Sequence, residues 1–115
     1  MIEKELTVSE IEEVIERLEH HLEVYNECKY QYENASKQKE RDRAFKFMIT
    51  YANFMRREFE KPKILEIIEG NITVPYTFEN FARYADVDVS SYLVKLKKEL
   101  EKRIKEEKKK EEKKE

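Results

Sequence analysis

Glycine, proline and cysteine are scarce in this sequence of 115 residues. It has one glycine, two prolines, one cysteine and no tryptophan, while lysine and glutamate dominate. With few helix breakers and many strong helix formers, the sequence predicts an all-α fold. The lone Cys28 cannot form a disulfide or a cysteine-based metal site within the chain, which favours a cytoplasmic location.

Long apolar runs are also missing. No segment approaches the ~20 apolar residues that a membrane-spanning helix needs, and the first residues lack the apolar core of a secretory signal. The length predicts one domain with a modest core, which we place at residues 1–104. Charged residues make up 43% of the sequence, a composition that resembles that of thermophile proteins.

The net charge of -2 hides a strong segregation of charge along the chain. Residues 1–33 carry ten acids and three bases, whereas residues 34–63 carry nine bases and four acids. Residues 64–94 hold five acids and one base, and residues 95–115 hold eleven bases and seven acids. A polyanion is therefore expected to dock on the second or the last of these segments.

Hydrophobic spacing predicts three helices in the first part of the chain. Thr7 and Glu10 have the spacing of a capping box, which starts a helix that runs to about residue 33. A second helix is expected from about residue 37 to 60, and a short third helix from residue 63 to 69. The residues expected in the core step by three and four; they are Ile11, Val14, Ile15, Leu18, Leu22, Tyr25, Cys28 and Tyr32, then Ala44, Phe45, Met48, Tyr51, Ala52, Met55 and Phe59.

The second half is predicted to hold two more helices around a turn. Residues 72–76 are rich in β-branched residues and include a proline, so we expect an extended connector there. A fourth helix is expected from Thr77 to about Ala85, then a turn at residues 86–88 and a fifth helix through Ile104. Residues 105–115 are lysine and glutamate alone, which predicts a charged tail, a helical extension or a linker. The expected architecture is a compact bundle of about five helices.

Apart from its many acids, the sequence has few residues of the types that bind metals or carry out catalysis, and their spacing does not bring them together in one site. His20 and His21 are adjacent, so they diverge by about 100° around a helix, and the simplest interpretation puts His21 at the core edge and His20 in solvent. The single glycine cannot build a phosphate-binding loop, and no serine or cysteine has a convincing base near it. We therefore expect no metal site and no catalytic residues, and hence a binding domain rather than an enzyme.

The most informative pattern lies on the second helix. Six polar residues there, at positions 39, 43, 46, 50, 53 and 57, are spaced by four or three and so share one face. Lysine and arginine there would neutralise phosphates, and Phe47 and Phe54 beside them would stack on unpaired bases. Thr50 and Asn53 would read base edges or a nucleotide's ring. The pattern predicts a site for single-stranded nucleic acid, with no membrane involved. Its residues are Lys39, Arg43, Lys46, Phe47, Thr50, Asn53, Phe54, Arg56 and Arg57.

Two other interpretations of this face stay open. It is nearly as compatible with a solvated surface, with Phe47 and Phe54 packed on the fifth helix or on a partner chain. A basic aromatic helix is also typical of binding at a membrane surface, although the opposite face of this helix is expected to lie in the core.

Residues 81–96 resemble a helix-turn-helix motif. Phe81-Ala82 matches the apolar residue and alanine of the first helix, Ala85 the small residue before the turn, and Val87 the apolar turn residue. Asp86 replaces the usual turn glycine, and the second helix fits only with one inserted residue. The resemblance implies a duplex-binding transcriptional regulator. Near its recognition surface would lie Ser90, Ser91, Tyr92 and Lys95.

The whole chain also resembles the helix-bundle domain of archaeal plasmid replication primases. The likeness lies in its size, its Lys-, Glu- and Ile-rich composition, the short bundle and the charged ending at residues 108–110. The resemblance implies a domain that does not polymerise, that recognises the single-stranded DNA template and binds ATP or another nucleotide, and that is flanked by primase and helicase domains. It assigns no individual binding residue. A structural protein that assembles through its first and last helices is the remaining alternative.

Overall fold

The computed structural model describes residues 6–68 and 78–113, with side chains for residues 6–68 and 83–109. The described chain forms α1 (Val8–Asn34), α2 (Gln38–Phe59), α3 (Pro62–Ile67) and α4 (Phe78–Lys113). No strand occurs within these described ranges, which confirms the all-α prediction. The connector expected at residues 72–76 lies outside them.

The start of α1 is fixed by the predicted capping box. The Thr7 hydroxyl accepts a hydrogen bond from the Glu10 amide at 3.1 Å, and the Glu10 carboxylate accepts one from the Thr7 amide at 3.5 Å. These bonds satisfy two backbone donors that a helix start otherwise leaves open. The predicted apolar stripe of α1 is confirmed: its residues are buried from Ile11 to Cys28, except that Leu22 is only half-buried, as is Tyr32 beyond them.

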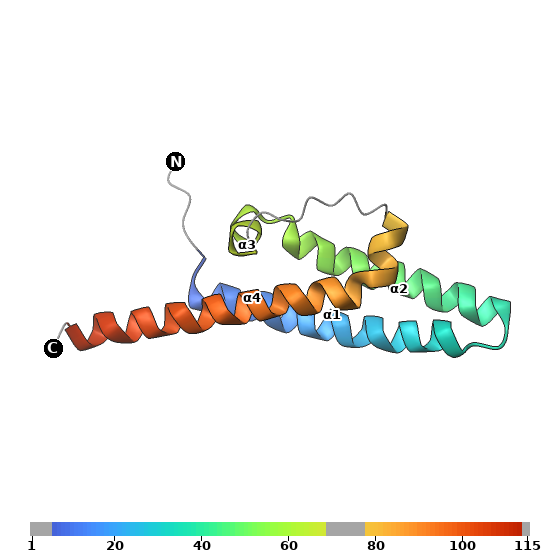
Figure 1. Cartoon of the computed structure of the whole chain (residues 1–115), viewed down its shortest axis with the longest axis horizontal. Helices are drawn as coiled ribbons and strands as arrows, with labels where there is room; N and C mark the ends of the chain where they lie inside the picture. Colours follow the sequence, from blue (N-terminus) through green and yellow to red (C-terminus); the bar gives the residue numbers. More distant parts are fainter. Residues whose placement is uncertain (1–5, 69–77, 114–115) are drawn as a thin grey trace.

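Helices α1 and α2 form an antiparallel hairpin joined by residues 35–37 (Figure 1). The inner side of α2 buries Ala44, Met48, Ala52, Met55 and Phe59, all of which the spacing predicted. Phe45 and Tyr51, predicted with them, are only half-buried at the edge of the core. Because both inner stripes repeat at three and four residues, they stay in contact along the whole hairpin.

The second half of the chain contains one long helix where two were predicted. The turn expected at residues 86–88 is wrong, because α4 continues through these residues as a helix, although its first turns are bent relative to the rest (Figure 1). The physical reason is an unbroken buried stripe that steps by four, four and three through Ala85, Val89, Leu93 and Leu96. The Ser90 hydroxyl donates to the carbonyl of Asp86 at 2.6 Å, one turn back inside the helix. Without the turn, residues 81–96 do not form a helix-turn-helix.

Helix α4 runs antiparallel to α1. Two polar contacts, one near each end of α1, fix the register between the two helices. Near the start of α4, the Asp86 carboxylate pairs with Lys29 Nζ at 2.9 Å. Farther along, the Arg103 guanidinium donates to the backbone carbonyl of Leu6, just before α1 begins. Beyond residue 104, where a tail was one expectation, the helix continues to Lys113, and residues 105–109 are exposed.

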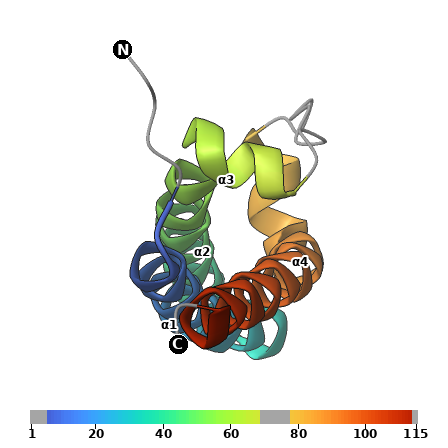
Figure 2. The ribbon, with the colours of Figure 1, turned by 90° about the vertical axis from the view of Figure 1, so that its left-hand side faces the viewer.

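The short α3 lies across α2 and α4, as the end-on view in Figure 2 shows. Ile64 within it and Ile68 just after it are fully buried, so α3 covers this side of the core. The molecule measures 65 × 26 × 20 Å. It is elongated because α1, α2 and most of α4 lie along one direction, while the first turns of α4 bend away from it (Figure 1).

Candidate nucleic-acid interface

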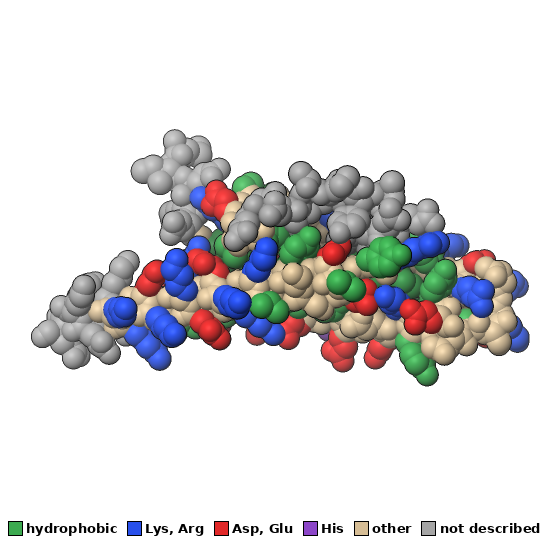
Figure 3. Space-filling model, in the orientation of Figure 1, with side chains coloured by type: hydrophobic (Ala, Val, Ile, Leu, Met, Phe, Trp, Pro, Cys, Tyr) green, Lys and Arg blue, Asp and Glu red, His purple; other side chains and the backbone are tan. Residues whose placement is uncertain are grey.

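The outer side of α2 presents the polar face that the sequence predicted. This basic face comprises Lys39, Arg43, Lys46, Thr50, Asn53 and Arg57. All six are exposed except Asn53, which is half-buried. In the space-filling view, Lys and Arg gather where α1 and α2 meet and along the outer part of α4, while acidic side chains follow the edge formed by α1 (Figure 3).

The four cations of this face make no ion pair within the described part of the chain. Two of the acids nearest to them along the helix are engaged elsewhere. Asp42 accepts a hydrogen bond from Gln38 at 2.8 Å, and Glu60 pairs with Arg56 at 3.4 Å. The positive charge of the face is therefore available to an anionic ligand.

Two of the predicted site residues on α2 already have a partner within the helix, and a third is half-buried. Arg56 lies about 100° away from Arg57 around the helix, is half-buried and pairs with Glu60. The Thr50 hydroxyl donates to the carbonyl of Lys46 at 3.0 Å, which leaves only its oxygen lone pairs for a ligand. Asn53 is half-buried. These residues would contribute less to binding than the four exposed cations.

Phe54 belongs to a cluster of rings between α1 and α2. It is 38% exposed, and its ring centroid lies 5.3 Å from that of His21 and 5.6 Å from that of Tyr51. Burial, followed by the neighbouring His20, lowers the pKa of His21. His21 is half-buried and His20 exposed, as the sequence indicates. Phe54 therefore presents one part of its ring to solvent, while the rest packs within the protein.

Phe47 lines a cleft that sequence reasoning missed. The cleft has a volume of about 540 Å³ and lies between the end of α1 and the start of α2. Phe47 is 46% exposed, and Tyr30 from α1, which is 68% exposed, shares the lining with it. Both rings lie off the buried stripes of their helices. That was the available signal, but only the hairpin shows that the rings share one cleft.

The predicted recognition residues on α4 lie on a different helix from the basic face. Ser90 and Ser91 are exposed, and Lys95 is half-buried. Tyr92 packs its ring edge-on against Phe59 of α2, with centroids 5.0 Å apart. Tyr92 therefore contributes to the packing of α4 on α2.

A buried acid, which the sequence did not single out, joins the two helices of the hairpin. Glu58 is only 9% exposed, and it accepts two hydrogen bonds from Arg17, at 2.8 and 3.1 Å. Lys61 donates a third at 2.7 Å. Burial alone would raise the pKa of Glu58, but the hydrogen bonds from Arg17 and Lys61 outweigh it and the pKa is lowered. These contacts link α1 to the end of α2, the helix that carries the basic face.

Within residues 6–68 and 78–113, no three His, Cys, Asp or Glu side chains are grouped as a metal would need. None of the helices described there combines the length and apolar character that crossing a bilayer requires. Comparison of the chain with protein-family models, with curated proteins and with solved structures finds no match.

Proposed function

We propose that this chain is a non-catalytic helical module that binds single-stranded DNA along the basic face of α2, as an accessory domain of a replication primase. One observation carries the binding role: four exposed cations, Lys39, Arg43, Lys46 and Arg57, share one helix face and make no ion pair among the described residues. From the first to the last, the face extends about 27 Å at 1.5 Å per residue, enough for several phosphates of a strand. The assignment to a replication primase rests on the resemblance of the whole chain alone.

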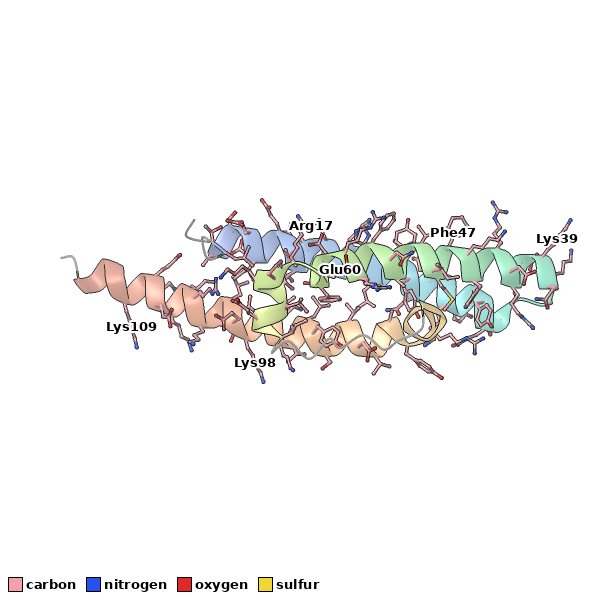
Figure 4. The ribbon with its side chains drawn as sticks, turned by 90° about the horizontal axis from the view of Figure 1, so that it is seen from above. Arg17, Lys39, Phe47, Glu60, Lys98 and Lys109 are labelled. Carbon is pink, nitrogen blue, oxygen red and sulfur yellow. The ribbon has the colours of Figure 1, made fainter. Side chains whose placement is uncertain are left out.

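The rings beside the cations favour a single strand over a duplex. Phe47 and Phe54 both reach solvent next to this face, and Figure 4 shows Phe47 and Lys39 projecting from α2. In a duplex the bases are stacked on one another and offer only their edges. An unpaired base offers its flat face, on which an aromatic ring stacks. ATP or another nucleotide, which joins a base to phosphates, is a second ligand of the same chemistry.

Charge reversal on two helices tests the proposal. We expect Arg43→Glu combined with Lys46→Glu to weaken binding of a labelled single strand by roughly tenfold or more, because both phosphate contacts turn repulsive. The matched control combines Lys98→Glu with Lys109→Glu. These two lysines are also exposed, but they project from α4 on the other edge of the molecule (Figure 4). Equal losses in the two variants would show only non-specific attraction and would refute a site on α2.

A further inference from the structure

The cleft at the closed end of the hairpin has the components of a site for one base. Tyr30 and Phe47 come from different helices, line the same cleft and are both well exposed. Neither ring belongs to the buried core of its helix. Large exposed aromatic rings in a shared cleft are typical of a surface that stacks on a flat ligand.

The polar groups around the two rings include acceptors for an amine. Asn34 donates its side-chain amide to the Tyr30 carbonyl at 2.8 Å, which leaves its own carbonyl oxygen for a ligand. Glu40 also lines the cleft and adds a carboxylate. A carboxylate and an amide oxygen accept hydrogen bonds from the exocyclic amine of a base, as carboxylates do from cytosine.

One cation connects this cleft to the basic face. Arg43 lines the cleft together with Phe47 and belongs to the four exposed cations of α2. A strand whose phosphates follow α2 would therefore bring a base to the cleft while a phosphate meets Arg43. This places the base site at the Lys39 end of the basic face, away from Arg57.

We infer that the cleft between Tyr30 and Phe47 holds one unpaired base of the bound strand, a base that carries an exocyclic amine, stacked on the two rings. The inference rests on the proposed function and deepens it. It assigns binding roles to Tyr30, Asn34 and Glu40, none of which the charge pattern on α2 identifies.

The test uses an oligothymidylate that contains a single 2-aminopurine, a fluorescent base with an exocyclic amine. Anisotropy of an end label reports binding of the strand, and 2-aminopurine emission reports stacking of that base. We expect emission to change on binding to the native chain. Tyr30→Ala and Phe47→Ala should each abolish that change and weaken binding by about 5- to 150-fold, the range for one stacked base. The control Tyr84→Ala removes an exposed ring that does not line the cleft, and it should behave as the native chain.

The outcomes separate the inference from the proposed function. Binding by anisotropy without any change in 2-aminopurine emission would overturn the base site and leave the basic face as the binding surface. Absence of binding altogether would overturn both. A concentration-dependent mass of the native chain that Tyr30→Ala abolishes would assign the cleft to self-association and would also overturn the inference. Helix content by circular dichroism verifies that each variant is folded.

Discussion

Arg17 on α1 and Glu58 on α2 form a bidentate ion pair across the hairpin, with nitrogen–oxygen distances of 2.8 and 3.1 Å. Glu58 is nearly enclosed, whereas Arg17 keeps part of its side chain in solvent. The pair links α1 to the last turn of α2, the helix that carries the basic face. When a buried carboxylate loses such a partner, its desolvation is no longer offset and the folded state is destabilised.

Removal of Arg17 is expected to destabilise the fold without changing its architecture. We expect Arg17→Ala to lower the free energy of unfolding by about 1–3 kcal/mol, because Glu58 then retains only Lys61 as a charged partner. Urea denaturation followed by circular dichroism measures the change. Arg57→Ala, an exposed arginine without an ion pair in the described residues, is the matched control and should change stability by less than about 0.5 kcal/mol. Equal effects of the two substitutions would contradict a structural role for the pair.

The lowered pKa of Glu58 predicts how stability depends on acidity. A carboxyl whose pKa is lower in the folded state stabilises the protein above its unfolded pKa, which is near 4.5. This contribution is lost as the pH falls through the folded pKa, because the unfolded chain then binds a proton more readily. We expect the free energy of unfolding to decline below about pH 4.5.

Glu58→Gln isolates that contribution. The variant should be less stable than the native chain at pH 7, and its stability should decline less steeply below pH 4.5. Urea denaturation at a series of pH values gives both curves. Parallel curves for the native chain and the variant would show that Glu58 is not the group responsible.

The continuity of α4 gives a third prediction. Val87 is exposed in the middle of the segment where a turn was expected. Proline there would remove a backbone donor and clash with the preceding turn of the helix, so Val87→Pro should cost about 3 kcal/mol or more. Val87→Ala, the control, should leave stability unchanged or slightly raise it. If thermal denaturation showed that proline is tolerated as well as alanine, the chain would have a turn at this point.

Local patterns predicted most of the helices, and tertiary pairing accounts for what they missed. The capping box of Thr7 and the two inner stripes of the hairpin depend on residues three and four apart, so the sequence contains them directly. Asp86-Val87-Asp88 resembled a turn because aspartate favours turns. In the structure Asp86 instead pairs with Lys29, 57 positions away. No local pattern reports such a contact.

The sequence predicts one part of the candidate site, the basic face, but not the other part, the cleft. The basic face follows from helical spacing alone, and all four of its cations are exposed, as that spacing requires. The cleft required the pairing of α1 with α2, because Tyr30 and Phe47 are 17 positions apart and come from different helices. The partial packing of Phe54 against His21 likewise appears only in three dimensions.

Binding of a single strand by the basic face of α2 is tested most directly by the salt dependence of that binding. Fluorescence anisotropy of a labelled oligonucleotide between about 50 and 200 mM salt gives the slope of log affinity against log salt. Each neutralised phosphate of a single strand contributes about -0.7, so engagement of the four cations of α2 predicts a slope of about -3. The slope should become shallower when Arg43 and Lys46 are replaced by alanine. Absence of binding at the lowest salt, or a slope that these substitutions leave unchanged, would show that the basic face of α2 does not bind a single strand.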